Sequence, residues 1–332
     1  MSQQDISSLI ESFSKLRLVV IGDVMLDRFI WGNVTRISPE APVPVVEVNR
    51  ESVYPGGAAN VARNITPFGG KVELIGLIGS DSEGEVLAKT LEDCHIGIDH
   101  MLVEKSFSTI TKTRVVAQHQ QVVRIDREKK QALTDNARNL VLNQLRNVVG
   151  EVDGIIIEDY GKGLIDNELV SSVVEIATAG DVVVTVDPNP KNPIDWKGVS
   201  TVKPNRSEAF HEAGMQDSSA HLPPLEDGDL LQVGNHLLKR WDSQYVLITL
   251  GEQGMILFSD RGQPYHIPTR AREVFDVSGA GDTAIAVFTM ALCAGANALT
   301  AADLSNRASG VVVGKLGTAE ITKEDLLKAV EG

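Results

Sequence analysis

Short apolar runs alternate with amphipathic segments of helical length along most of the chain. The amphipathic segments are residues 81–93, 134–149, 167–179 and 229–240. The apolar runs, rich in Val, Ile and Leu, are residues 18–21, 72–77, 154–157, 182–186, 245–250 and 255–258. Nearly continuous apolar strands separated by helices are typical of a parallel sheet that helices cover on both faces. The pattern therefore predicts an α/β body.

Two segments follow a different pattern, in which polar and apolar residues alternate. Residues 31–50 contain Pro39, Pro42 and Pro44, and residues 109–128 interleave polar residues with Val and Ile. Such alternation predicts antiparallel strands with one side facing solvent or a partner. We expect a small β-sheet, built from about residues 28–56 and 109–128, that projects from the body. Residues 216–228 predict a loop insertion.

The segment 283–302 has no charged residue and is long enough for a membrane span. Thr, Gly and Asn dilute it, and Ala dominates over Leu and Ile, so we expect a buried helix that is interrupted near residues 294–297. The first residues of the chain contain early acids and do not resemble a signal peptide. We therefore expect a cytoplasmic protein that does not bind membranes.

The composition narrows the classes of function. The 332 residues include 31 Lys and Arg against 45 Asp and Glu, a net charge of −14. This argues against nucleic-acid binding, which needs a basic surface. The two cysteines, Cys94 and Cys293, lack the spacing of a zinc site or a disulfide framework, which fits a reducing cytosol. Phosphate chemistry would need local anion sites rather than a broad positive field.

The most informative motif is D-V-S-G-A-G-D-T at residues 276–283, at the start of the charge-free helix. The small residues Gly279, Ala280 and Gly281 let backbone N–H groups turn inward at a helix N-terminus, where they can bind an anion. Asp282 then either caps the helix or acts as a general base beside a phosphate. The same letters also match a dinucleotide fingerprint, although that fingerprint belongs to a first βαβ unit.

Other candidate groups follow the predicted strands. Asp23 and Asp27 come after the first apolar run, where open α/β sheets bind ligands, and carboxylates suit the hydroxyls of a polyol. Gly56 and Gly57 let the backbone approach a ligand, and Asn60 offers a donor and an acceptor. An ordinary helix N-terminus fits the same stretch.

Asn205 and Glu208 are three residues apart and would face the same side of a helical turn. The pair could hold a hydrated Mg²⁺, but an N-cap Asn with a capping-box Glu fits the same spacing. Thr249, Gly251 and Gly254 lie in a glycine-rich turn after a strand. A complete Walker A sequence is absent.

The order of these motifs along the chain resembles that of the ribokinase-like (PfkB) carbohydrate kinases. The resemblance extends over about residues 18–327 and is most specific at the G-A-G-D of residues 279–282. It implies an α/β fold, namely a three-layer α/β/α sandwich with a mainly parallel central sheet and a small β-sheet lid. A single kinase domain would then occupy residues 1–332.

One branch of that family is most similar. G-D-V-M-L-D-R at 22–28, R-I-S-P-E-A-P-V-P-V-V at 36–46, P-G-G-A-A-N-V-A at 55–62 and G-V-V-V-G-K-L-G-T at 310–318 resemble the D-glycero-β-D-manno-heptose 7-phosphate kinases. Those enzymes phosphorylate the anomeric C1 hydroxyl on the way to ADP-heptose for the lipopolysaccharide core. In many bacteria they form the N-terminal half of a bifunctional protein. No HxGH-like motif occurs here, so we expect the kinase half without a nucleotidyltransferase domain.

The resemblance also implies catalytic roles and cofactors. Asp282 would take the proton of the sugar hydroxyl, and the N–H groups of Gly279, Ala280 and Gly281 would bind the transferring phosphoryl group. Asn205 and Glu208 would organise the phosphates of ATP and, through water, Mg²⁺.

The remaining contacts follow in the same way. The nucleotide contacts would come from Thr249, Gly251, Gly254 and Asn306. The sugar contacts would come from Asp23, Asp27, Gly56, Gly57 and Asn60. Asp276 and Ser278, with the backbone near Gly314 and Gly317, match a potassium site of some members. The lid often forms the interface of a homodimer.

A phosphorylated sugar also needs cations near the lid. The candidates are Lys112, Arg114, Arg124 and Lys162, of which Lys112 and Arg114 share one face by the two-residue period of a strand. Each of them also fits an ordinary solvated charge. Competing hypotheses are a kinase for ribose, fructose phosphate or a nucleoside, a non-catalytic sugar- or nucleotide-binding regulator, and a dinucleotide oxidoreductase.

Overall fold

The computed structural model describes residues 3–331, except 119, 271–273, 275 and 316–318. Its central sheet has eight strands in the order β14-β13-β12-β11-β10-β9-β1-β4. The parallel strands are β1 (Arg17–Gly22), β4 (Lys71–Ile75), β9 (Gly154–Glu158), β10 (Val183–Asp187), β11 (Thr201–Val202) and β12 (Tyr245–Thr249). β13 (Met255–Ser259) and β14 (Tyr265–Ile267) continue the sheet in antiparallel fashion. The predicted apolar runs lie in this sheet, which is mainly parallel as expected.

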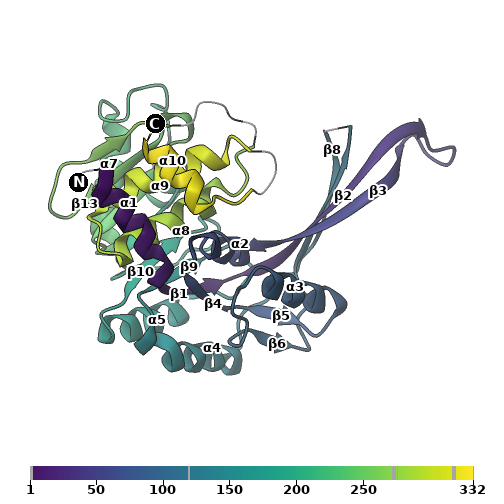
Figure 1. Ribbon diagram of the computed structural model, residues 1–332, viewed down its shortest axis with the longest axis horizontal. Helices are drawn as coiled ribbons and strands as arrows, with labels where there is room; N and C mark the ends of the chain where they lie inside the picture. Colours follow the sequence, from purple (N-terminus) through teal and green to yellow (C-terminus); the bar gives the residue numbers. More distant parts are fainter. Residues whose placement is uncertain (1–2, 119, 271–273, 275, 316–318, 332) are drawn as a thin grey trace.

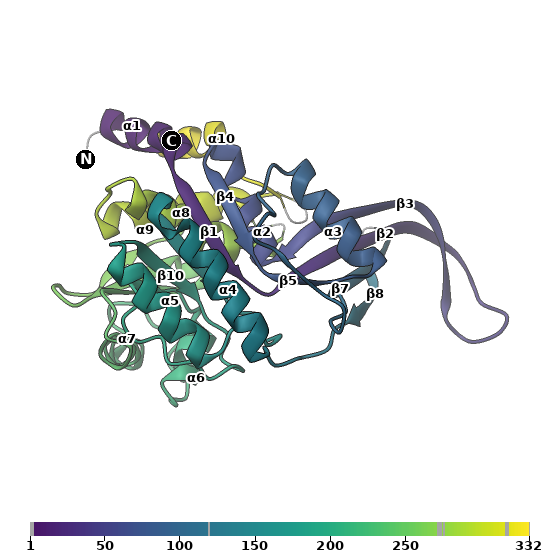
Figure 2. The same cartoon turned by 90° about the horizontal axis from the view of Figure 1, so that it is seen from below.

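Helices cover both faces of the sheet. One face carries α1 (Gln3–Ser12), α2 (Ala58–Arg63), α8 (Ala280–Cys293), α9 (Ala298–Val312) and α10 (Lys323–Glu331). The other carries α4 (Asp135–Val148), α5 (Asn167–Ala179), α6 (Arg206–Glu212) and α7 (Gly228–Trp241). Alternate residues of β1 point to the two sides, with Leu18 and Val20 in one core and Val19 and Ile21 in the other. Figures 1 and 2 show the resulting three-layer sandwich.

The charge-free segment forms two helices rather than one. α8 ends at Cys293, Gly295 has a φ of 88°, and the Asn297 side chain accepts the N–H of Thr300 to begin α9. The predicted interruption near residues 294–297 is therefore confirmed. Among the described residues, no helix is long and apolar enough to cross a membrane.

A second sheet projects from the body, as Figure 1 shows. Its strand order is β3-β2-β7-β8, and we call it the lid. The strands are β2 (Val24–Ile37), β3 (Pro44–Gly57), β7 (Thr111–Ala117) and β8 (Gln120–Arg127). Each predicted excursion is an antiparallel hairpin, but β2 and β7 pair in parallel. The antiparallel prediction thus holds within each hairpin and not between them, because both hairpins leave the body with their first strand.

The remaining elements are a further helix, a short strand pair and several 3₁₀ turns. They are α3 (Ser82–Asp93), the strand pair β5 (Leu77–Gly79) and β6 (Leu102–Glu104), and the 3₁₀ turns η1 (Phe13–Lys15), η2 (Thr66–Phe68), η3 (Val149–Glu151) and η4 (Gly251–Gln253). The predicted insertion at 216–228 lies between α6 and α7 and contains no helix or strand before Gly228. The side chain of Arg206 binds Asp217 and Asp227 at 2.7 Å each and so ties this loop to the start of α6.

Candidate active site

Three cavities adjoin one another where the parallel strands end and α8 begins. The lid cavity, about 270 Å³, lies between the lid and α8 and is lined by Met25, Asp27, Gly56, Gly57, Asn60, Lys112, Arg114, Arg124, Tyr160, Ser278, Gly279 and Asp282. The central cavity, about 470 Å³, includes Asp187, Lys203, Asn205 and Glu208. The outer cavity, about 550 Å³, includes Gly254, Ala280 and Asn306. Gly281 lines the central and the outer cavity, and its neighbour Asp282 lines the lid cavity.

The small residues at the start of α8 produce a tight turn. Gly279 is the N-cap and has a φ of 81°, which favours glycine. A Cβ at Gly279 would lie 3.1 Å from the Nδ2 of Asn60, so the turn approaches α2 closely. Of the N–H groups predicted to bind an anion, that of Ala280 donates to the carbonyl of Val277 at 3.2 Å. The helix N-terminus nonetheless adds positive potential beside the central cavity.

Asp282 is a buried carboxylate with two side-chain donors. Asn60 donates to Oδ2 at 2.6 Å and the hydroxyl of Tyr160 donates to Oδ1 at 3.1 Å, while only 8% of the residue is exposed. Burial, together with the negative charge of Asp187, raises the pKa of Asp282 to about 6, although the two donors and Lys203 oppose this shift. A base with this pKa is ionised at neutral pH and still accepts a proton readily.

Further charged groups lie behind Asp282. Carboxylate oxygens of Glu158, Asp187 and Asp282 lie within 4.8 Å of one another. The ammonium of Lys203 binds Asp187 at 2.8 Å and supplies a counter-charge, although only 4% of Lys203 is exposed. Burial alone would lower the pKa of Lys203, but Asp187 and Glu158 raise it, so this lysine stays charged. Its Nζ lies 3.5 Å from the position that a Cβ on Gly281 would occupy.

Sequence reasoning assigned no role to Tyr160, Glu158, Asp187 or Lys203. Glu158 and Asp187 are the last residues of β9 and β10, and Lys203 follows β11 directly. The rule that selected Asp23, an acid at the carboxyl end of a parallel strand, would have selected Glu158 and Asp187 as well. Tyr160 carried no comparable signal.

The lid brings most of the predicted sugar-binding residues to one cavity. Asp27, Gly56, Gly57, Asn60, Lys112, Arg114 and Arg124 line it together. The guanidinium of Arg114 binds the carboxylate of Asp27 and lies over the ring of Phe29, 5.3 Å from its centroid. A Cβ at Gly56 would lie 2.6 Å from Asp27 Oδ2, so this position has no room for a larger side chain.

Two predicted sugar contacts lie elsewhere. The carboxylate of Asp23 accepts the backbone N–H groups of Tyr160, Lys162 and Leu164, at 3.2, 2.9 and 3.1 Å. The ammonium of Lys162 binds Glu128 at 2.8 Å. Neither Asp23 nor Lys162 is among the residues that line the lid cavity.

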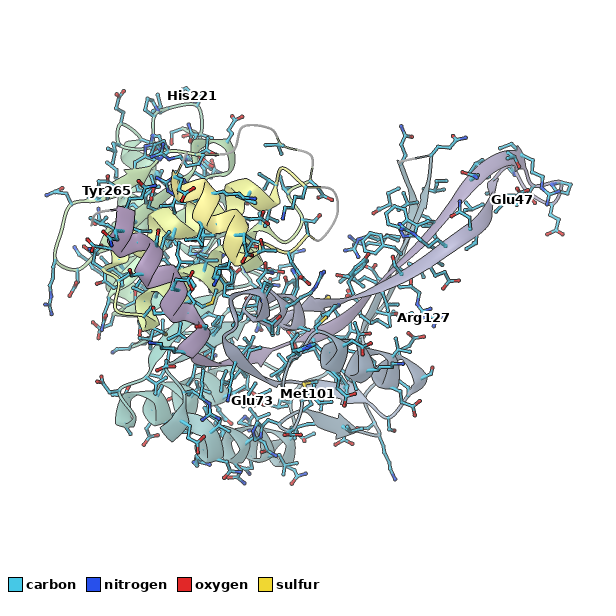
Figure 3. The ribbon with its side chains drawn as sticks, viewed as in Figure 1. Glu47, Glu73, Met101, Arg127, His221 and Tyr265 are labelled. Atoms are coloured by element: carbon cyan, nitrogen blue, oxygen red, sulfur yellow. The ribbon has the colours of Figure 1, made fainter. Side chains whose placement is uncertain are left out.

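Acidic residues of the lid accompany its cations. Lys112 lies 3.0 Å from Glu128 and 3.4 Å from Asp126, and Arg124 binds Asp126 at 2.9 Å. Slight burial would raise the pKa of Asp126, but Arg124 and Lys112 together hold it below its ordinary value. Figure 3 shows charged side chains along the whole lid, from Arg127 near its base to Glu47 near its tip.

The predicted nucleotide residues divide between the central and the outer cavity. Asn205 and Glu208 line the central cavity and also form a capping box, in which the Asn205 side chain accepts the N–H of Glu208 at 3.0 Å and Glu208 accepts that of Asn205 at 2.8 Å. Thr249 and Gly251 line both cavities. Asn306 lines the outer cavity and donates to the carbonyl of Pro268 at 2.8 Å.

The predicted potassium site is only partly described. Asp276 accepts the N–H of Ser278 at 2.9 Å and donates its own N–H to the carbonyl of Val313 at 3.3 Å. Asp276 therefore lies next to the end of α9, close in sequence to Gly314. Gly317 falls outside the described residues.

Comparison with known proteins shows similar chains in several bacteria. The chain is 42% identical over 322 residues to "Bifunctional protein HldE" of Magnetococcus marinus, covering 96% of this chain and 65% of that protein. It is 38% identical over 314 residues to the protein of the same name from Desulfatibacillum aliphaticivorans, covering 95% of this chain and 63% of that protein. The chain thus spans just under two thirds of the length of these relatives.

Solved structures show the same fold. Arabidopsis thaliana ribokinase, complexed with ribose and ATP, has a TM-score of 0.72 at 18% identity and covers 96% of this chain and 99% of its own. Phosphofructokinase-2 from Escherichia coli, in complex with potassium, has a TM-score of 0.74 at 18% identity and covers 95% of this chain and 98% of its own. The three-layer ribokinase-like sandwich with its lid is therefore confirmed.

The match to a family model covers nearly the whole chain, since residues 15–325 match the model of the pfkB family carbohydrate kinases. The match includes the lid, the start of α8 and all three cavities. The chain belongs to the pfkB family of carbohydrate kinases, and it is a phosphotransferase that acts on a sugar.

Proposed function

We propose that this kinase transfers the γ-phosphate of ATP to the C1 hydroxyl of D-glycero-β-D-manno-heptose 7-phosphate and so forms the 1,7-bisphosphate. The observation that carries the proposal is the position of Asp282 in the lid cavity, one residue from Gly281 in the other two cavities. A hydroxyl in the lid cavity and a phosphate in the central cavity would meet at the start of α8. A base and an anion site at this junction suit phosphoryl transfer.

The chemical step follows from the groups at the junction. Asp282 takes the proton from the sugar hydroxyl, whose oxygen attacks the γ-phosphorus while the bond to ADP breaks. The N–H groups of Gly279 and Gly281 and the ammonium of Lys203 stabilise the negative charge on the transferring group. Ala280 contributes less in this conformation because its N–H donates to Val277.

The central cavity suits Mg²⁺ with the phosphates of ATP. Asn205 and Glu208 offer an amide oxygen and a carboxylate, and Mg²⁺ prefers oxygen ligands and keeps several waters. Burial and the charge of Asp187 raise the pKa of Glu208, and a cation nearby would favour its ionised form. A bound Mg²⁺ would neutralise phosphate charge.

The outer cavity suits the adenosine part of ATP. It joins the central cavity at Thr249 and Gly251, and Gly254 and Asn306 lie farther along it. Gly254 has a φ of 87°, and a Cβ there would lie 2.1 Å from the carbonyl oxygen of Ile267. We also place a potassium site at Asp276 and Ser278, whose oxygens are ligands of the type that this ion takes.

The lid cavity suits a sugar that already carries a phosphate. Asp27 and Asn60 offer partners for sugar hydroxyls, and Lys112, Arg114 and Arg124 supply three cations on the lid side of the cavity. A phosphate on the far end of a heptose would reach these cations while C1 lies at Asp282. Asp23 and Lys162 support the cavity from outside rather than line it.

The test is phosphate transfer from ATP to a panel of sugars and sugar phosphates, with the product position determined by NMR. We expect heptose 7-phosphate to be the best acceptor and the new phosphate to lie on C1. Asp282→Asn should retain ATP binding and lose turnover by about 10² or more. Preference for ribose or fructose phosphate would reject the heptose assignment, and near-normal turnover of Asp282→Asn would reject the base.

A further inference from the structure

The loop after β9 is fixed by the carboxylate of Asp23. Both oxygens of this carboxylate accept backbone N–H groups of the loop. The donors are Tyr160, Lys162 and Leu164. Asp23 is 5% exposed, so its charge is compensated by these donors rather than by water. The loop therefore has one well-defined position relative to β1.

Further contacts hold the same loop. The side chain of Asp159 accepts the N–H of Gly161 at 2.7 Å and the Nδ2 of Asn192 at 2.9 Å. Gly161 and Gly163 have φ values of 66° and 116°, and a Cβ at Gly163 would lie 2.0 Å from the carbonyl oxygen of Gln131. The backbone of the loop can thus take few other paths, and Tyr160 is held at its root.

Tyr160 joins this loop to the candidate base. Its ring packs against the small apolar cluster of Met25, Phe107 and Ile110. Its hydroxyl lies 3.1 Å from Asp282 Oδ1 on the wall of the lid cavity. Asn60 donates to the other oxygen, so each oxygen of the carboxylate has its own donor, and together the two donors fix its orientation.

We propose that Tyr160 is a positioning residue for Asp282, held in place by Asp23, and that its hydroxyl keeps this carboxylate oriented and ionised toward the acceptor sugar. The role of Tyr160 in positioning a catalytic base rests on the function proposed above. The effect of its hydroxyl on the ionisation of Asp282 is independent of that function.

The charged groups around Asp282 explain why such a donor matters. Asp187 from β10 faces it with negative charge, and Lys203 after β11 is the opposing cation. Glu158 from β9 lies beside both carboxylates, and burial and their charges raise its own pKa well above the usual value. A donor to the ionised form lowers the pKa of a carboxyl group, so loss of the Tyr160 hydroxyl raises the pKa of Asp282 above its value of about 6. At neutral pH a larger share of the base would then carry a proton.

The test measures the ionisation of Asp282 directly by carbon NMR, in protein labelled at the Asp carboxyl carbons. The Asp282 resonance is the one that Asp282→Asn removes, which also separates it from Asp159, whose burial raises its pKa to about 6 as well. We expect the midpoint of Asp282 to rise by about one pH unit in Tyr160→Phe. Tyr265→Phe, on the far side of the body in Figure 3, should leave it unchanged. An unmoved midpoint in Tyr160→Phe, with the melting temperature retained, would overturn the proposal.

Kinetics give a second readout on the same variants. A rise of one unit would reduce kcat/KM about fivefold at pH 6 and leave it unchanged near pH 8.5. Every variant acts on the same substrate, so a difference in the midpoint of the pH profile between variants comes from the enzyme and not from the substrate. A uniform loss at all pH values would show a merely structural role and reject the proposal. If Asp282→Asn stayed active, the base assignment would fail, while the NMR midpoint would still decide the role of the Tyr160 hydroxyl.

Discussion

Asp282 carries a negative charge in a place where burial and the neighbouring carboxylate of Asp187 disfavour it. Asn60, Tyr160 and Lys203 oppose these effects. Functional sites often keep a buried charged group that lowers the stability of the fold, because the reaction needs that group in its ionised form. The motif predicted the residue, and the structure adds the reason why it can act near neutral pH.

The unfavourable burial of the Asp282 charge predicts that the stability difference between the wild type and Asp282→Asn depends on pH. The folded protein holds a proton on Asp282 up to about pH 6, whereas an unfolded Asp, with a pKa near 3.8, has released it. Between these values the folded form binds more protons, so the free energy of unfolding falls as the pH rises. Asp282→Asn removes this loss. We expect thermal melting to show no advantage of the variant at pH 4 and an advantage of about 2 kcal/mol, or a few degrees, at pH 8.

The matched control is Asp260→Asn, an exposed position at the end of β13. It should change the melting temperature little at either pH. If Asp282→Asn were destabilised equally at pH 4 and pH 8, the carboxylate would not carry the expected cost.

At the scale of elements, the lid places cations and anions on the same face. Lys112 and Arg114 of β7 lie opposite Asp126 and Arg124 of β8, and all four side chains lie on the cavity side by the period of the strands. In the proposed function, the sugar phosphate competes with Asp126 for Lys112 and Arg124. Asp126 therefore lowers the affinity of these cations for any anion. Only an anion that makes further contacts in the cavity would bind well.

Opposite effects are expected from two substitutions in the lid. Arg114→Ala removes a proposed phosphate contact and should raise KM for heptose 7-phosphate tenfold or more, at about 1.5–3 kcal/mol for a hydrogen bond between charged groups. Asp126→Asn removes the competing carboxylate and should lower KM about two- to fivefold, as expected for a partly exposed ion pair. Steady-state kinetics measure both.

Arg127→Ala serves as the control, because Arg127 lies on β8, next to the strand of Arg114, but does not line the lid cavity. Its KM should stay at the wild-type value. An unchanged KM in Arg114→Ala, with the fold intact, would remove Arg114 from the phosphate site.

At the scale of the whole molecule, the lid presents apolar side chains to solvent. Val123 and Ile125 on the edge strand β8 are 47% and 48% exposed, on the face opposite Arg124 and Asp126. Exposed apolar edge strands are unusual in a monomer because they invite pairing. We propose that the lids of two copies of this chain pack together in a homodimer.

The dimer predicts a clear response to added charge. Val123→Lys with Ile125→Lys should convert the dimer to a monomer, because burying two ammonium groups against an apolar surface is unfavourable. Light scattering after size exclusion measures the mass. Leu140→Lys, at an exposed apolar position of α4, is the control and should remain dimeric. A monomeric wild-type protein would reject the proposed interface.

Much of the element pattern and the start of the candidate site were predictable from local patterns. The period of apolar residues predicted the strands of the body and the helices between them, and the small residues before Asp282 predicted the turn at the start of α8. The alternation in residues 109–128 predicted the β7–β8 hairpin. These features depend on residues close together in the chain, whose spacing sets which side each side chain faces.

Only the tertiary structure decided which groups surround that turn. Asn60 and Tyr160 meet Asp282 across 222 and 122 residues of chain, and Asp23 supports the loop of Tyr160 rather than lining the lid cavity. The parallel pairing of β2 with β7 likewise joins two separate hairpins. The sequence alone determined the periodic elements and the candidate catalytic motif because both are local. Contacts at the carboxyl ends of the strands depend on the order of strands in the sheet. That order results from the packing of segments that are far apart in the chain.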